Sequence, residues 1–292
     1  MSISEALGEK RTAETPAGTI EYRERGSGPT LVFVHGVGVN GDLWRDVAPR
    51  LADTHRCVVP DLPWGSHTQP LHVDADLSLP GMARIVADFI EVLGLEDVTI
   101  VANDTGGAVA QSLVGAHPER IGRLVLTSCD AFEKFPPTPQ RYLEVAARSR
   151  ALMWLVAWSA QFKFVQRLPT AYGWVTSGPL EPAIMHSYTD PIRANPLVRR
   201  DLARLLRAVD TRYTFAAAEA LRSFDKPALV LWADGDKIFP RAHGRKLAEL
   251  LPQGRFELIE SSRTFIPEEQ PQRLAAIVRE FVNGDRRGGG SV

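Results

Sequence analysis

Residues 98–107 read Val-Thr-Ile-Val-Ala-Asn-Asp-Thr-Gly-Gly and are the stretch that decides the fold. The apolar run 98–102 predicts a buried strand, and residues 108–117 predict a helix. The turn between them has the pattern of a nucleophile elbow, in which a strained apex residue needs small neighbours two before it and two and three after it. Asp104 is the apex residue. The positions that must be small hold Ala102, Gly106 and Gly107.

An aspartate at this apex determines the type of chemistry. A carboxylate oxygen attacks an electrophilic carbon, whereas a serine would transfer an acyl group. An unperturbed aspartate has a pKa of about 3.9 and is almost wholly ionised at neutral pH, so Asp104 is expected to need no base for its attack.

The composition is that of an ordinary globular protein. The chain has 292 residues, of which 44% are hydrophobic, and its formal net charge is −1. This charge gives no case for nucleic acid, and no basic block is dense enough to predict a membrane partner, so a small neutral molecule is the expected substrate. Cys57 and Cys129 make no disulfide framework. Because residues 1–11 lack an apolar signal core and no run of 18 apolar residues occurs, we expect a cytoplasmic protein.

Strand and helix patterns alternate through both ends of the chain, which predicts an α/β fold with a mostly parallel, eight-stranded sheet covered by helices on both faces. Residues 19–25 and 31–34 are expected to form a hairpin entering this sheet. Between 131 and 224 the alternation stops, and aromatic residues and prolines accumulate. We therefore expect a core from residues 1–130 and 225–285, a helical cap from 131–224, and a disordered tail at 286–292.

Four places in the sequence together resemble the α/β-hydrolase fold, and specifically its branch with an aspartate nucleophile. That branch includes haloalkane dehalogenases, fluoroacetate dehalogenases and epoxide hydrolases. The places are His35-Gly36, Asp61-Leu62-Pro63, the elbow at Asp104, and Asp236 in the run 231–236. The resemblance covers nearly the whole chain.

The resemblance implies a role for several residues. The backbone N–H groups of Val37 and Thr105 should form an oxyanion hole. Asp236 matches the acid that orients a catalytic imidazole, with Asp234 as the nearby rival. His35 is expected to pack and hydrogen-bond beneath its loop at the border of the substrate site. The remaining predicted substrate-binding residues are Trp64, Trp154 and Tyr188.

The catalytic histidine of the relatives has no counterpart at its usual place. Thr264 stands there, in the run 262–271, and a threonine hydroxyl cannot serve as a general base near neutral pH. Arg263 could then pair with Asp236 instead. His67 lies in the loop after the fourth strand of the family's pattern, and it is either a surrogate base or a loop histidine bonded to backbone.

Other markers of the family are also replaced. Thr105 stands where haloalkane dehalogenases have a halide-binding Trp and fluoroacetate dehalogenases an Arg, and Val37 stands where an Asn is frequent. Epoxide hydrolases use cap tyrosines to protonate the oxirane. Four tyrosines are available here: Tyr142, Tyr172, Tyr188 and Tyr213.

Three functions remain open at this stage. The first is hydrolysis of a carbon–halogen or epoxide bond with Asp104 as nucleophile, at the floor of the largest enclosed pocket. The second is a lyase or isomerase step with Asp104 as a base or electrostatic group. The third is a ligand-binding protein without catalysis. No cofactor or metal motif is apparent, and the oligomeric state cannot be predicted.

Overall fold

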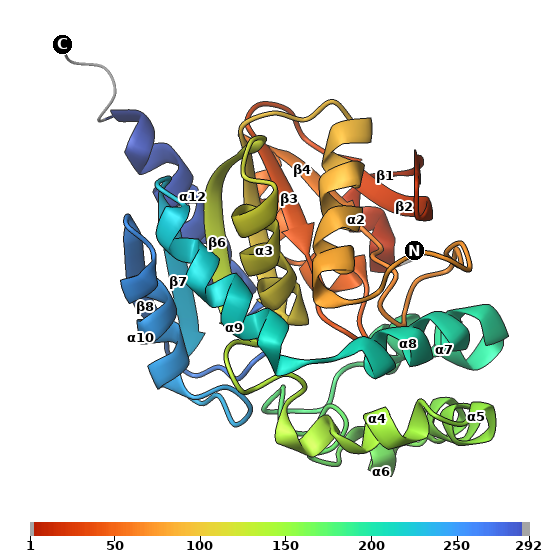
Figure 1. The fold of residues 1–292 in the computed structure, drawn as a ribbon. Coiled ribbons are helices and arrows are strands. Elements are labelled where there is room, and N and C mark those ends of the chain that lie inside the picture. Colours follow the sequence, from red (N-terminus) through yellow and green to blue (C-terminus); the bar gives the residue numbers. More distant parts are fainter. Residues whose placement is uncertain (1–2, 288–292) are drawn as a thin grey trace.

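A computed structural model describes residues 3–287 of the chain (Figure 1). The eight strands are β1 (Glu9–Thr15), β2 (Gly18–Arg25), β3 (Thr30–Val34), β4 (Arg56–Pro60), β5 (Val98–Asp104), β6 (Ile121–Cys129), β7 (Ala228–Ala233) and β8 (Gly254–Ile259). They form one sheet in the order β1-β2-β4-β3-β5-β6-β7-β8, in which every pair from β4 to β8 is parallel. The predicted α/β fold with its eight-stranded, mostly parallel sheet is confirmed.

The helices follow the strands in the alternating pattern, except between β6 and β7. They are α1 (Ala48–Leu51), α2 (Leu79–Val92), α3 (Thr105–Ala116), α4 (Tyr142–Ala146), α5 (Arg150–Ser159), α6 (Lys163–Gln166), α7 (Pro182–Ala194), α8 (Pro196–Ala208), α9 (Thr211–Ala220), α10 (Arg241–Leu250), α11 (Ile266–Glu269) and α12 (Pro271–Arg287). Short 3-10 helices are η1 (Ile3–Leu7), η2 (Gly41–Trp44), η3 (Thr138–Gln140) and η4 (Leu221–Ser223). Of the tail predicted at 286–292, the first two residues end α12 and the rest lies outside the described residues.

The predicted hairpin between residues 19–25 and 31–34 is wrong. Strand β2 instead pairs antiparallel with β1 on one side and with β4 on the other. Strand β1 escaped the sequence analysis because it is an edge strand with a polar sequence, in which only Ala13 and Thr15 are buried. Edge strands carry little of the hydrophobic pattern that reveals a central strand.

The sheet is covered on both faces. Helices α2, α3, α9 and α10 form one layer, and α1 packs with α12 in the other (Figure 1). Every residue of β3 from Leu31 to Val34 is fully buried, as expected for a parallel strand between two helical layers. Helix α9 lies within the range predicted as cap, yet it packs against α3 of the core.

Helices α4 to α8 form a separate group across one end of the sheet (Figure 1). Buried polar contacts fix this group to the core. The Tyr188 hydroxyl of α7 donates to Glu268 at 2.6 Å, and Glu268 pairs with Arg45 at 2.5 Å. The Asn40 amide of the core donates to the Ser187 carbonyl at 3.1 Å. These contacts hold α7 against the loops that follow the parallel strands.

Candidate active site

Asp104 ends β5 and adopts the strained backbone of an elbow apex, with φ 57° and ψ −134°. A non-glycine residue at positive φ is uncommon and concentrates at functional sites. A Cβ on Gly106 would collide with the Val34 carbonyl, and one on Gly107 would collide with Cys129. The small residues of the motif are therefore required by the close approach of β3 and β6.

Asp104, Val37 and Thr105 together line a cavity of about 190 Å³ between the core and the cap. Most of its other lining is apolar and comes from the cap, including Leu143, Val156, Ala157, Val165, Ile192, Leu202 and Leu206. The sequence correctly predicted that these three residues meet beneath the cap.

The prediction that Asp104 lies in the largest pocket is wrong. A larger hollow of about 550 Å³, which we call the outer hollow, is lined by residues of α6, α7 and the loop between them. Residues lining both spaces are Gln166, Tyr172 and Thr189. The Asp104 cavity is thus the inner of two adjoining spaces.

Burial changes the acidity of the predicted nucleophile. Desolvation, and next the nearby Asp236 carboxylate, raise the pKa of Asp104 from 3.8 to about 7, although a hydrogen bond from the Thr105 backbone lowers it. The expectation of an almost wholly ionised Asp104 is therefore wrong. Near neutral pH this carboxyl is divided between its charged and its protonated form.

Asp236 lies beside Thr264, as predicted. The Thr264 hydroxyl donates to Oδ1 of Asp236 at 2.9 Å, and the backbone N–H groups of Ile238 and Phe239 donate to the same oxygen at 2.8 Å. The other oxygen, Oδ2, is buried and has no hydrogen-bond partner among the described residues. A threonine hydroxyl thus occupies one side of the Asp236 carboxylate.

The predicted pairing of Arg263 with Asp236 is wrong. The Arg263 guanidinium donates to the carbonyls of Gly173 and Thr176, at 3.0 and 2.6 Å, and so binds the cap. The rival acid Asp234 contacts the backbone N–H of Ser262 at 3.4 Å. Thr264 instead contacts Asp236, and besides desolvation it is the Asp236 charge that raises the pKa of Asp104.

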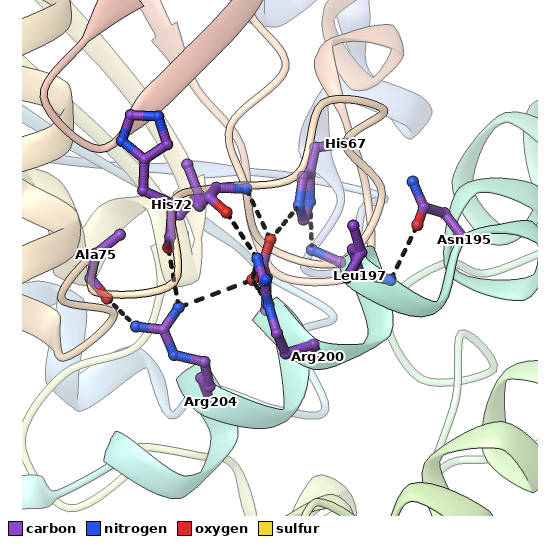
Figure 2. A network of polar contacts seen from close by, with 10 residues as sticks. His67, His72, Ala75, Asn195, Leu197, Arg200 and Arg204 are labelled. Carbon is purple, nitrogen blue, oxygen red and sulfur yellow. Dashed lines mark hydrogen bonds and ion pairs between the residues drawn. The ribbon is translucent and has the colours of Figure 1, made fainter.

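His67 faces the cap helix α8, and the structure does not place it on the Asp104 cavity (Figure 2). Its Nε2 lies 3.4 Å from Oδ2 of the buried Asp201, and its Nδ1 accepts the Gly65 backbone N–H at 3.3 Å. Asp201 also accepts the Leu71 backbone N–H at 2.9 Å and pairs with Arg200. Nε2 therefore joins the loop to α8 while Nδ1 is bonded to the loop's own backbone, an arrangement that agrees with the alternative of a loop histidine bonded to backbone.

Of the predicted substrate-binding residues, only Tyr188 lines the inner cavity. His35 is fully buried beneath its loop, where Nδ1 donates to the Gly36 carbonyl and Nε2 accepts the Leu62 backbone N–H, both at 2.8 Å. Burial lowers the pKa of His35 to about 4, so the ring is neutral. Trp64 is buried against His35, and Trp154 is exposed on the outside of the cap. The structure thus contradicts the substrate-binding role for His35, Trp64 and Trp154.

Asp130 contacts the site and was missed, whereas Tyr172 was among the four tyrosines that the sequence offered. Asp130 follows β6, is fully buried, and accepts a hydrogen bond from the Thr105 hydroxyl at 2.7 Å. Burial and the nearby Asp104 raise the pKa of Asp130 well above its usual range. Tyr172 lines the cavity and donates to the Gly38 carbonyl at 2.6 Å. A sequence signal existed for Asp130, because it directly follows the strand that ends at Cys129, next to β5 in the sheet.

No histidine lines the inner cavity within the described part of the chain. Over the same residues, no group of three or more His, Cys, Asp or Glu side chains could hold a metal ion. Asp104 supplies a carboxylate on the cavity wall beside Thr105 and Tyr172, while Asp130 is hydrogen-bonded behind Thr105 and Asp236 is hydrogen-bonded to Thr264.

Comparisons with known proteins agree with this geometry. The family model described as alpha/beta hydrolase fold matches residues 29–168. An uncharacterized protein of Mycobacterium tuberculosis is 28% identical over 90% of this chain and 77% of its own length. Haloalkane dehalogenase 2 of the same organism is 26% identical over 93% of this chain and 94% of its own.

Two further similarities extend this picture. A cis-3-alkyl-4-alkyloxetan-2-one decarboxylase of Shewanella oneidensis is 25% identical over 90% of this chain and 85% of its own. The crystal structure of a putative ancestral haloalkane dehalogenase superposes with a TM-score of 0.76 at 22% identity, covering 94% of this chain and 98% of that one.

The sheet order and the elbow are those of the α/β-hydrolase fold, whose family model matches residues 29–168. The proteins to which this chain is similar include haloalkane dehalogenases. None of the helices in residues 3–287 is both long and apolar enough to cross a membrane.

Proposed function

We propose that this protein is an enzyme in which Asp104 attacks a carbon atom of a small, largely apolar molecule. The observation that carries the proposal is the position of Asp104, at the strained apex of the elbow and on the wall of an apolar cavity. A carboxylate oxygen forms a bond to carbon, the carbon–halogen or carbon–oxygen bond breaks, and an ester with the enzyme results. The similarity to haloalkane dehalogenases supports this reaction class.

The second half of such a reaction needs an activated water. The amides of Val37 and Thr105 are the proposed donors to the oxyanion that forms when water attacks the ester. The Val37 amide makes no hydrogen bond to another described residue, so it is available for this role. A general base to activate this water is lacking among the residues that line the cavity, because Thr264 makes the contact with Asp236 and no imidazole lines the cavity. The ester is therefore expected to accumulate.

An epoxide fits the cavity better than a halide does. Neither Val37 nor Thr105 has a side chain of the kind that binds a halide in the relatives, whereas a hydroxyl can protonate an opening oxirane. The Tyr172 hydroxyl lies on the loop that carries Val37, and Tyr172 also lines the cavity. The Tyr188 hydroxyl donates to the Glu268 carboxylate, whereas the Tyr172 hydroxyl donates to the uncharged carbonyl of Gly38 beside Val37, so Tyr172 is the proposed acid.

Intact-mass spectrometry tests this proposal directly. The protein is incubated with a short-chain 1,2-epoxide and with a 1-bromoalkane, and the wild type is compared with Asp104→Ala and Thr264→His. A covalent adduct in the wild type, absent in Asp104→Ala and shorter-lived in Thr264→His, is the expected result. Absence of both adduct and product with either reagent, in the wild type and in Thr264→His, would contradict it.

A second candidate is a non-hydrolytic reaction in which Asp104 acts as a general base. The observation that favours it is the pKa of Asp104, raised to about 7, because a base works best when its pKa is near the operating pH. Such a lyase or isomerase needs no activated water, and the oxetanone decarboxylase among the relatives supports this class. Turnover of an alkyl oxetan-2-one without an adduct, and without ¹⁸O uptake from labelled water, would select this candidate. Binding without turnover would leave a ligand-binding protein.

A further inference from the structure

Helix α5 carries apolar side chains on its outer face as well as on its inner face. Met153 and Ala157 are buried against the cap, as expected for a surface helix. The apolar residues exposed on the same helix are Leu152, Trp154, Leu155 and Trp158. A surface helix normally presents polar residues to water, so the outer face of α5 is unusual.

The exposed aromatic side chains form a continuous row that reaches α6. Trp154 stacks on Trp158 with ring centres 6.2 Å apart, Trp158 contacts Phe162 at 4.8 Å, and Phe162 contacts Phe164 at 5.9 Å. The side chains of Trp154 and Phe164 are 53% and 68% exposed. We call this row, with Leu152 and Leu155, the cap aromatic face. It lies at the edge of the cap that is remote from the sheet (Figure 1), and contiguous apolar patches of this kind mark interaction surfaces.

The stretch of chain that carries the cap aromatic face has charges of one sign. Residues 145–180 contain no Asp or Glu. The basic residues of this stretch, all exposed, are Arg148, Arg150, Lys163 and Arg167. Lys163 and Arg167 make no ion pair with any residue from 3 to 287 for which the structure gives contacts. Their charge is therefore available to an anionic partner.

We propose that the cap aromatic face docks on the surface of an anionic lipid bilayer. Tryptophan side chains favour the headgroup level of a bilayer, because the ring is largely apolar while its N–H can hydrogen-bond to water. Flanking Lys and Arg residues attract acidic headgroups. Charge selects this occupant over a second copy of the chain. A symmetric dimer through this face would bring two sets of four cations together.

The docking face adjoins the route to the inner cavity. Lys163 and Arg167 line the outer hollow, which shares Gln166 and Tyr172 with the cavity of Asp104. An apolar molecule dissolved in the bilayer would therefore enter beside α6 with little exposure to water. Docking on a bilayer requires no chemistry at Asp104, so it can be measured without turnover. The outcome of that measurement is therefore independent of the proposed reaction.

Vesicle sedimentation tests the proposal with the full chain. Vesicles of pure phosphatidylcholine are compared with vesicles that also contain phosphatidylserine, at low and at physiological salt. We expect stronger binding to the acidic vesicles, which weakens as salt rises. The double variant Lys163→Gln/Arg167→Gln should lose about fivefold in partitioning per removed cation.

The apolar contribution is tested by Trp154→Ser/Phe164→Ser, which should reduce binding at least about tenfold. Phe215→Ser is the matched control, because Phe215 on α9 is a similarly exposed aromatic residue outside the cap aromatic face. Circular dichroism verifies that each variant folds. Absence of binding at low salt, equal binding to neutral and acidic vesicles, or an equal loss in Phe215→Ser would overturn the proposal. Concentration-dependent dimerisation removed by Trp154→Ser, without vesicle binding, would overturn it in favour of a second copy.

Discussion

Replacing Asp104 with asparagine is expected to stabilise the fold, and more so as the pH rises. Burial and the nearby Asp236 carboxylate raise the pKa of Asp104 from 3.8 to about 7. The folded protein therefore favours the protonated carboxyl, and the penalty for ionising it grows as the pH rises from the unfolded pKa to the folded one. Asparagine has nearly the shape of the protonated carboxyl but cannot ionise.

The size of the effect follows from linkage. With a pKa of 3.8 in the unfolded chain and about 7 in the fold, the penalty is below about 1 kcal/mol at pH 4 and on the order of 4 kcal/mol at pH 8. Below the unfolded pKa, Asp104 is protonated in both states and the free energy of unfolding carries no penalty. Between the two pKa values the free energy of unfolding falls as the pH rises, and above about pH 7 it levels off. The advantage of Asp104→Asn should follow the same curve.

Urea unfolding at pH 4, 6 and 8 measures this curve. The free energies of unfolding of the wild type and Asp104→Asn are subtracted at each pH, which removes the titration of groups that do not interact with Asp104. The titration of Asp130, whose pKa Asp104 raises, remains part of the difference. Asp225→Asn is the control, because Asp225 is exposed, and its difference from the wild type should not change with pH. A difference for Asp104→Asn that is the same at pH 4 and pH 8, or a variant less stable than the wild type at pH 8, would refute the reasoning.

Two further predictions concern packing. Gly106→Ala should lower the free energy of unfolding by about 1–3 kcal/mol or more, because its Cβ would meet the Val34 carbonyl. Thermal unfolding measures this loss. The control is Gly284→Ala, which should cost nothing because the space around Gly284 is open. Asp201→Ala should cost about 3–5 kcal/mol and speed proteolysis within the cap, because it leaves Arg200 and the Leu71 amide without their buried partner; unchanged cleavage would show that this network does not hold the cap.

The elbow could be predicted from the sequence because its requirements are local. A residue at positive φ between a strand and a helix forces small neighbours, and Gly106 and Gly107 stand where β3 and β6 approach. The alternation of strands and helices was equally readable, because parallel strands are buried on both faces. The polar edge strand β1 gave no such pattern.

Side-chain direction could not be predicted from the sequence. His67 follows a strand that ends at the active-site edge, yet its partner Asp201 comes from a cap helix 134 positions later in the chain. The position of His67 in a loop does not reveal which residue, so far away in the sequence, its ring contacts. Trp154 was correctly assigned to the cap region but lies on its outer side.

The electrostatics of the site and of the cap also required the fold. Asp104, Asp130 and Asp236 are far apart in the sequence, and only the sheet brings their carboxylates close enough to raise one another's pKa. The expectation of no membrane partner rested on the density of basic residues along the chain. The lack of acidic residues in 145–180 could have been read from the sequence, whereas the exposure of the aromatic side chains in this stretch required the fold.

The contacts between cap and core determine which part of the cap can move. Tyr188, Ser187, Asp201 and Arg263 fasten α7, α8 and the loop at Gly173 to the core. Within the described residues, α5 and α6 make no side-chain hydrogen bond to the core. Amide hydrogen exchange should therefore be fastest in the cap at α5 and α6 and slow in α7 and α8. The rate at which ligands reach Asp104 would then be limited by local opening at this margin, with the remainder of the cap acting as a fixed wall.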